Sequence, residues 1–125
     1  MTGSKRVLLV DDDPMSREAI RTALEQTLVS VEEAANGLEA IAMLHERRFD
    51  YVVVDLKIPI VSAYEVLRHA RTKSPFADPI ALSEAAGRRL TTVRPGLVST
   101  VLLKSEAAFE LPQRIAAPAL THAAA

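Results

Sequence analysis

Four short apolar runs in this chain are each followed by a polar residue whose side chain can do chemistry. The runs cover residues 7–10, 51–54, 79–82 and 101–103. The residues that follow them are Asp11, Asp55, Ser83 and Lys104, and two more acids, Asp12 and Asp13, come directly after Asp11. Such short apolar runs are typical of strands covered on both faces of a parallel sheet. Because the carboxyl ends of parallel strands meet at one edge, we expect these side chains to surround one crevice.

Segments with helix signals separate the apolar runs. Asp13 and Pro14 suit the N-cap and the first position of a helix. The Asn-Gly pair at 36–37 predicts a turn before a second helix, and residues 62–65 form a capping-box pattern that opens a third. A weaker strand is expected over residues 29–33.

The C-terminal part of the chain continues this alternation less clearly. A fourth helix is expected over 85–93, although Gly and Thr residues make it a poor one. The last strand is predicted at 99–103 and a final helix between 106 and 117. We expect Pro118 to end or bend that helix, and residues 118–125 to form a frayed tail.

Five strand–helix units with right-handed crossovers predict an α/β fold with helices on both faces of a parallel sheet. Five strands favour the doubly wound, flavodoxin-like order 2-1-3-4-5. The switch point then lies between the first and third strands, where Asp11, Asp12 and Asp55 are expected. A length of 125 residues fits a single domain, 1–125, with its core over residues 6–117.

Composition narrows the possible functions. The formal net charge of -1 offers no global basic field, so we expect no nucleic-acid partner. The chain has no Cys, which excludes disulfides, thiol catalysis and thiolate metal sites. No apolar run approaches the roughly 20 residues of a membrane span, so we expect a cytoplasmic protein without membrane contact.

Three clustered carboxylates favour a metal site. They repel one another unless a cation joins them, and oxygen ligands favour a hard ion such as Mg²⁺. We assign Asp11, Asp12 and Asp55 to this ion. Asp55 is also the carboxylate best placed to attack phosphorus and form an aspartyl phosphate. Lys104 would hold a phosphoryl oxygen, and the Ser83 hydroxyl could donate a hydrogen bond to the product.

With Val10-Asp11-Asp12, Asp55 and Pro59, Ser83, and Lys104 each in its place after a strand, the chain resembles the receiver domains of two-component response regulators. The resemblance extends from residue 7 to about residue 117. It implies that Asp55 is the phosphoacceptor. It also implies that Asp11 and Asp12, helped by the main-chain carbonyl of Lys57, hold Mg²⁺, that Ser83 is the switch hydroxyl, and that Lys104 pairs with the phosphoryl group.

The resemblance also implies partners. The phosphodonor would be a phosphohistidine on a sensor histidine kinase or on a histidine phosphotransfer protein. The domain would catalyse its own phosphorylation and dephosphorylation, without a separate turnover substrate. No DNA-binding segment follows the final helix, so we expect a stand-alone receiver. It would signal to a protein target that the sequence does not name, relay the group onward, or drain phosphate from a kinase.

Four positions depart from the family pattern. Glu84 follows the switch hydroxyl in place of a small residue, where its carboxylate could screen the site or repel an anionic donor. Ala63 replaces the usual Gly, and Ser105 replaces the Pro that usually follows the lysine. Val101 stands where the family has its switch aromatic, so the usual coupled rotation of hydroxyl and ring cannot operate. These changes predict an intact phosphorylation centre with an altered relay.

Three other functions were weighed. The departures allow a degenerate receiver that acts as an interaction module without phosphate. A haloacid-dehalogenase-type phosphatase would use Asp11 and Asp13, but Met15 breaks its motif and the chain lacks room for a cap domain. In a flavodoxin the first loop binds phosphate with hydroxyls and amides, whereas the acidic triplet would repel phosphate without a metal.

The three histidines are expected to be structural. His45 and His69 lie late in predicted helices, where a cationic ring suits the helix dipole. His122 lies in the predicted tail. None of the three is predicted to be a phosphodonor or a ligand.

Overall fold

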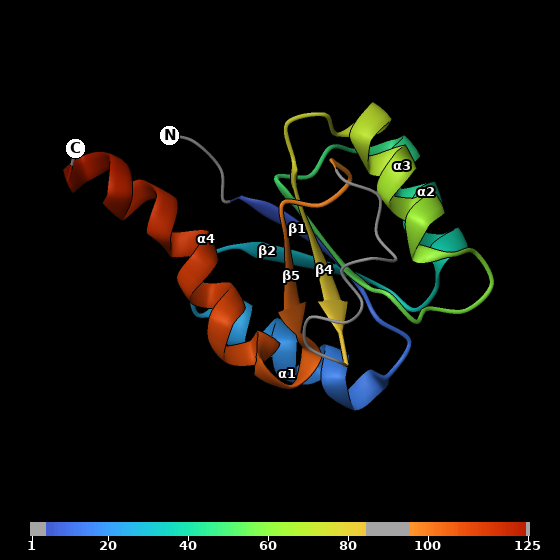
Figure 1. The fold of residues 1–125 in the computed structure, drawn as a ribbon, viewed down its shortest axis with the longest axis horizontal. Coiled ribbons are helices and arrows are strands. Elements are labelled where there is room, and N and C mark those ends of the chain that lie inside the picture. Colours follow the sequence, from blue (N-terminus) through green and yellow to red (C-terminus); the bar gives the residue numbers. More distant parts are fainter. Residues whose placement is uncertain (1–4, 85–95, 125) are drawn as a thin grey trace.

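The computed structural model of the chain describes residues 5–84 and 96–124. It contains a five-stranded parallel sheet in the order β2-β1-β3-β4-β5, which confirms the predicted topology (Figure 1). The strands are β1 Arg6–Val10, β2 Ser30–Ala34, β3 Tyr51–Asp55, β4 Asp78–Ser83 and β5 Thr100–Leu103. Their carboxyl ends therefore share one edge, and the order of strands reverses between β1 and β3.

The described helices cover both faces of this sheet. They are α1 Pro14–Glu25, α2 Gly37–Glu46, α3 Ala63–Lys73 and α4 Ala107–Ala124, with a 3-10 turn, η2, at Lys104–Glu106. Figure 1 shows α1 and α4 on one side and α2 and α3 on the other. The fourth helix predicted at 85–93 lies outside the described residues. In the described part of the chain, no helix combines the length and apolarity needed to cross a membrane.

Helix starts follow the predicted caps at Asp13 and Ser62 and the predicted turn at Asn36. Asp13, Asn36 and Ser62 are the N-caps of α1, α2 and α3, and each side chain accepts a hydrogen bond from a backbone N–H two or three residues later. Pro14 occupies the first turn of α1, where its missing N–H would have no partner in any case. These caps fix where each helix leaves the edge that holds the acidic residues.

The prediction for the end of the last helix was wrong. The helix continues through Pro118 to Ala124 instead of ending near residue 117, so most of the expected tail is helical. A proline removes one backbone donor and costs about 3 kcal/mol in a helix interior. Here it stands in an Ala-rich stretch, residues 116–124, and Ala is the best helix former.

Successive strand residues alternate between two cores. On β1, Val7 and Leu9 pack with residues of α1 and α4, whereas Leu8 and Val10 pack with residues of α2 and α3. All four side chains are completely buried. This period of two is what a sheet covered on both faces requires, and it holds the strand ends at fixed positions.

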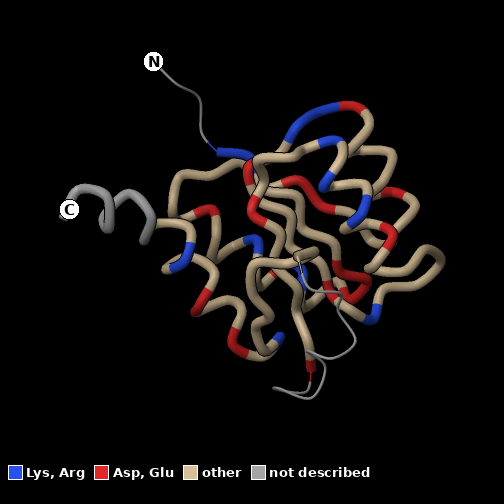
Figure 2. Tube along the Cα trace, turned by 45° about the horizontal axis from the view of Figure 1, so that its top comes forward, with Lys and Arg blue, Asp and Glu red and all other residues tan. Residues whose placement is uncertain are grey.

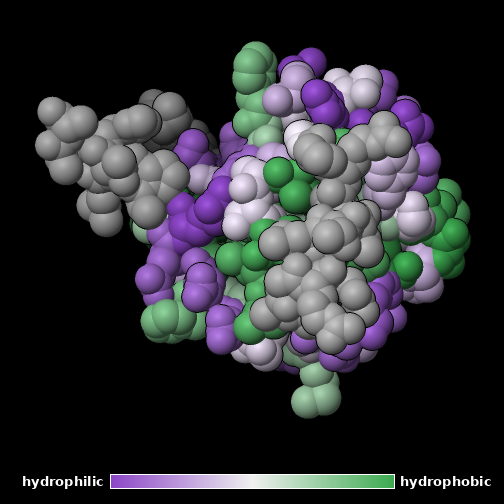
Figure 3. Space-filling model, in the orientation of Figure 1, coloured by the Kyte–Doolittle hydropathy of each residue, from purple (hydrophilic) through white to green (hydrophobic). Residues whose placement is uncertain are grey.

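The surface shows no single dominant chemistry in the views drawn. Lys and Arg residues alternate with Asp and Glu around the trace in Figure 2. On the face shown in Figure 3, hydrophobic side chains form several separate groups among hydrophilic ones. Exposed large apolar residues include Met15, Phe76 and Phe109, which lie on different elements.

The loop between β3 and α3 contains a strained turn. Ile60 has a φ of 76°, and the N–H of Val61 donates to the carbonyl of Pro59 at 2.9 Å across it. This arrangement is a γ-turn with a positive φ at its central residue, which is a rare and strained form, and a β-branched residue at positive φ is an outlier. The loop packs closely on the start of α2, since a Cβ added to Gly37 would overlap the carbonyl oxygen of Val61. The contact ties the segment after Asp55 to the sheet edge.

Replacing Ile60 with Gly is expected to raise the free energy of unfolding by about 0.5–1 kcal/mol. Loss of the Cβ relieves roughly 1–2 kcal/mol of strain, which outweighs the freedom that Gly adds to the unfolded chain. Urea denaturation measures the change. The control is Ile60→Ala, which also removes the exposed apolar side chain but keeps a Cβ and should gain little. Equal gains in both variants would show that the backbone is not strained.

Candidate functional site

Lys104 links two buried carboxylates that are distant in sequence. Its Nζ lies 2.7 Å from Oδ2 of Asp55 and 3.1 Å from Oδ1 of Asp11. Asp55 is 2% exposed and Asp11 is fully buried. Asp11 follows β1, Asp55 ends β3, and Lys104 follows β5. The predicted convergence of these strand ends is therefore observed.

Asp11 is held by the start of α1 as well as by Lys104. Its Oδ1 accepts a hydrogen bond from the N–H of Asp13 at 3.0 Å, and its Oδ2 accepts one from the hydroxyl of Ser16 at 2.8 Å. Arg17 donates to the main-chain carbonyl of Asp11 at 2.6 Å. Neither Ser16 nor Arg17 was predicted from the sequence, although both lie in the first helical turn after the acidic triplet.

Asp55 is oriented by two donors. Its Oδ1 accepts from the backbone N–H of Lys57 at 2.9 Å, while Lys104 donates to Oδ2. Two bonds to different oxygens fix the plane of the carboxylate. A fixed carboxylate is a better nucleophile than a freely rotating one, because less orientation entropy is lost on reaction.

Asp12 completes an acidic group that suits a divalent cation. One carboxylate oxygen from each of Asp11, Asp12 and Asp55 lies within 4.8 Å of the others, and Asp12 is exposed to solvent. Three carboxylates and the one ammonium of Lys104 leave a net charge of −2 at this place. Oxygen-only ligands with that charge fit Mg²⁺, which keeps several waters and takes few protein ligands.

The ammonium of Lys104 is stabilised in its charged form. Burial opposes the charge, but the hydrogen bonds that Lys104 donates to Asp55 and Asp11, together with the charges of both carboxylates, outweigh it and raise the pKa of Lys104. Lys104 therefore remains a cation throughout the neutral pH range. A fixed ammonium next to Asp55 can stabilise negative charge on a group that Asp55 receives.

Ser83 is buried at the carboxyl end of β4, next to β3. In the β3–β4 register Asp55 is opposite Leu82, and the N–H of Leu56 donates to the carbonyl of Leu82 at 2.9 Å. Ser83 therefore follows the residue opposite the predicted phosphoacceptor. This position is where a switch hydroxyl was expected, and its role remains a prediction.

Lys57 and Glu84 form an ion pair at the rim of the site. Lys57 Nζ lies 3.0 Å from a carboxylate oxygen of Glu84, and both side chains are exposed. The hydrogen bond from Lys57 lowers the pKa of Glu84, so this carboxylate is ionised at neutral pH. From the sequence, only the Lys57 carbonyl has a predicted role, and the Glu84 carboxylate is expected to screen the site or repel an anionic donor; their ion pair was not predicted. The pair connects the loop after β3 with the segment after β4.

The other three departures occupy ordinary positions. Ala63 is the first residue of α3 and is buried. Val101 lies half-buried in β5 opposite Ala81, where it has no ring to rotate. Ser105 lies within η2, and the described residues contain no cis peptide bond.

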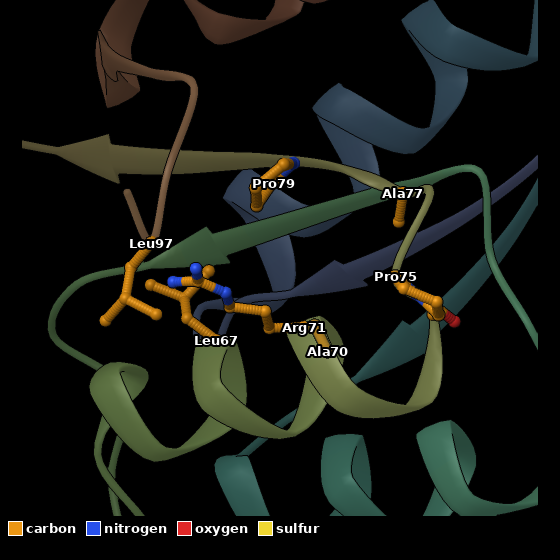
Figure 4. Close-up of a pocket in the computed structure, with 8 residues that line it drawn as sticks. Leu67, Ala70, Arg71, Pro75, Ala77, Pro79 and Leu97 are labelled. Atoms are coloured by element: carbon orange, nitrogen blue, oxygen red, sulfur yellow. The ribbon is translucent and has the colours of Figure 1, made fainter. Parts of the chain in front are cut away.

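A separate hollow lies between α3 and the sheet, away from the acidic residues. Figure 4 shows Leu67 and Ala70 of α3 on one side of it, with Pro79 and Leu97 on the other. Its volume is about 130 Å³. Arg71 donates to the carbonyl of Gly96 at 3.4 Å beside it. Among the described residues that line this hollow there is no carboxylate, so this part of its lining does not share the chemistry of the acidic site.

The structure is a doubly wound α/β domain with two buried acids at its switch point and a lysine that contacts both. The sequence model described as the response regulator receiver domain matches residues 7–116. The chain belongs to this family of receiver domains.

Two curated relatives support the assignment. Transcriptional regulatory protein ResD of Bacillus subtilis is 36% identical over 93 residues, which are 74% of this chain and 38% of ResD. Response regulator MprA of Mycobacterium tuberculosis is 41% identical over 68 residues, or 54% of this chain and 30% of MprA. The chain thus spans less than half the length of these relatives.

Solved structures show the same architecture. TrrA of Thermotoga maritima, solved with Mg²⁺ and BeF, is 28% identical, with a TM-score of 0.78 over 89% of this chain and 96% of TrrA. The receiver domain of the sensor histidine kinase PA1611 of Pseudomonas aeruginosa is 25% identical, with a TM-score of 0.76 over 90% and 94% of the two chains. That structure has a magnesium ion in its active site cleft.

Replacing Lys104 with Met is expected to lower the free energy of unfolding by about 3 kcal/mol when metal is chelated, because two buried carboxylates lose their cation. Saturating Mg²⁺ should restore much of the loss, since the ion supplies positive charge to the same oxygens. Urea denaturation with EDTA or with Mg²⁺ measures both effects.

The matched control for this test is Lys57→Met. It removes an exposed lysine from the same rim and should cost less than about 0.5 kcal/mol. A Lys104→Met variant as stable as the parent protein in EDTA would mean that the ammonium is not needed to keep the two acids buried.

Proposed function

We propose that this chain is a phosphoacceptor receiver domain of a two-component system, which takes a phosphoryl group from phosphohistidine onto Asp55 in the presence of Mg²⁺. The observation that carries the proposal is the position of Lys104, which contacts both Asp55 and Asp11 beside Asp12. A nucleophile, a cation and an acidic metal site are then within reach of one phosphorus atom.

The reaction is an exchange of one phosphorus bond for another. A carboxylate oxygen of Asp55 attacks phosphorus, the P–N bond to the donor imidazole breaks, and the leaving ring nitrogen keeps the electron pair and takes up a proton. The Lys104 ammonium pairs with one oxygen of the transferred phosphoryl group. The Ser83 hydroxyl donates to another oxygen. In dephosphorylation, water attacks phosphorus, the P–O bond to Asp55 breaks, the carboxylate keeps the electron pair, and inorganic phosphate leaves.

Asp11, Asp12, Asp55 and the main-chain carbonyl of Lys57 would hold the Mg²⁺. When bound, the ion would neutralise charge on the transferring phosphoryl group. The donor set fits this role, since it offers oxygen atoms only and carries excess negative charge. Mg²⁺-containing structures of related receivers support the choice of ion.

The proposed partners follow from the family. The donor is a sensor histidine kinase or a histidine phosphotransfer protein, met in the cytoplasm, and the output is a contact with a downstream protein. The named relatives are response regulators, which supports this assignment. A receiver that works without phosphate is not favoured, because the acids and the lysine are all present and in contact.

The direct test is phosphorylation of the purified chain by acetyl phosphate with Mg²⁺, followed by intact-protein mass spectrometry. We expect one phosphoryl group per chain, and none in Asp55→Asn, because an amide oxygen is a poor nucleophile. Asp13→Asn is the matched control. It replaces a neighbouring acid, keeps a good N-cap residue, and should be labelled fully. Full labelling of Asp55→Asn would refute the assignment.

Replacing Glu84 with Ala is expected to speed labelling by acetyl phosphate about two- to tenfold at low ionic strength. The change removes a negative charge from the rim and leaves the Lys57 ammonium free to attract an anionic donor. The gain should shrink as salt screens exposed charges. Glu84→Gln, which removes the charge but keeps the size, should behave similarly. A rate that is unchanged or lower in both variants would contradict the electrostatic explanation.

A further inference from the structure

Two of the three histidines lie together on the outer helices. His45 is in the last turn of α2 and His69 is in α3. Their ring centroids are 5.7 Å apart and the rings are tilted by 57°. Both rings line one cavity of about 240 Å³, together with Arg68, Thr72 and Lys73. The sequence reading treated each ring separately, but the packing of α2 on α3 makes them a pair.

The hydrogen bond of His69 determines which ring nitrogen is available. Its Nδ1 lies 2.9 Å from the main-chain carbonyl of Glu65. A carbonyl can only accept, so Nδ1 carries the proton. In the neutral ring Nε2 then keeps its lone pair. A histidine whose other nitrogen donates to a carbonyl is the usual arrangement of a metal ligand in proteins.

The separation of the rings fits a shared ion. Zn–N bonds are about 2.0–2.1 Å long, so two imidazoles on one tetrahedral ion have ring centroids roughly 5–6 Å apart. We propose that His45 and His69 form a site for a borderline divalent transition metal, such as Ni²⁺, Zn²⁺ or Cu²⁺, that bridges α2 and α3. Water fills the remaining coordination positions. Imidazole suits these ions and does not suit Mg²⁺, so the site is independent of the acidic one and of the proposed function.

Two cationic side chains, Arg68 and Lys73, line the cavity beside the histidines. Arg68 is paired with Glu65 at 3.1 Å, which offsets its charge. Lys73 opposes a metal ion and favours an anion such as phosphate. However, one nitrogen of Arg68 donates to Glu65, the Nδ1 proton of His69 is bound to the Glu65 carbonyl, and the hydroxyl of Thr72 donates to the carbonyl of Arg68 at 3.4 Å. The cavity therefore offers an anion fewer donors than its composition suggests, while it offers a metal the lone pair of His69.

The test is a titration of the whole chain with Ni²⁺ in excess Mg²⁺, followed by calorimetry and by NMR. We expect paramagnetic broadening of the backbone amides around positions 45 and 69. His45→Ala and His69→Ala should each weaken Ni²⁺ binding by at least about tenfold. Removing a residue that only supports a metal ligand typically costs that much affinity, and removing a ligand itself should cost no less. His122→Ala is the control and should leave it unchanged. Broadening only near Asp11 and Asp55, or equal affinity in all three variants, would overturn the proposal.

Lys73→Gln separates a metal site from an anion site. Removing this cation should strengthen Ni²⁺ binding at the cavity, because it removes a repulsion. The same change would weaken the binding of inorganic phosphate at an anion site. Weaker Ni²⁺ binding in this variant, or phosphate binding in the parent protein that depends on Lys73 and the two histidines, would overturn the proposal.

Discussion

Two buried carboxylates beside one ammonium are the interaction on which the rest of this structure depends. Asp11 and Asp55 are almost completely removed from water, and each would be costly to ionise alone. The Lys104 ammonium stabilises the negative charges of both carboxylates, and these carboxylates in turn stabilise the charged form of Lys104. The interaction requires the ends of β1, β3 and β5 to meet, and only a particular strand order brings them together. The sheet topology and the chemistry of the site are therefore one constraint.

The site is rigid on its buried side and adjustable at its rim. Asp11 is fixed by backbone, hydroxyl and ammonium donors, and Asp55 by two donors. In contrast, Asp12, Lys57 and Glu84 are exposed, and the Lys57–Glu84 pair is of the kind that contributes little to stability. Such a pair can change without disturbing Asp55. If the chain accepts a phosphoryl group as proposed, the rim is where it can differ from its relatives in its choice of donor.

The sequence predicted the features that depend on local chemistry and strand period. The apolar runs, the caps Asp13 and Ser62, the strand order and the meeting of Asp11, Asp55 and Lys104 follow from such rules. Three sets of contacts do not follow from local rules, because each depends on how long side chains meet across packed elements. They are the contacts of Ser16 and Arg17, the Lys57–Glu84 pair and the His45–His69 pair. The predicted end of α4 near residue 117 was wrong, because the helix-breaking effect of Pro118 was considered without the helix-forming Ala residues around it.

The relay predicted from the departures can be described in the same physical terms. In β5, Val101 offers no ring that could move between two packed positions. A response to the proposed phosphorylation of Asp55 would then rely on hydrogen bonding and on charge. A phosphoryl group would bring new negative charge close to Lys57, whose backbone N–H already contacts Asp55 and whose ammonium is held by Glu84. The two anions would compete for one cation. The competition would act on the segment after β4 directly, because Glu84 begins it, so the proposed phosphorylation could be transmitted without an aromatic switch.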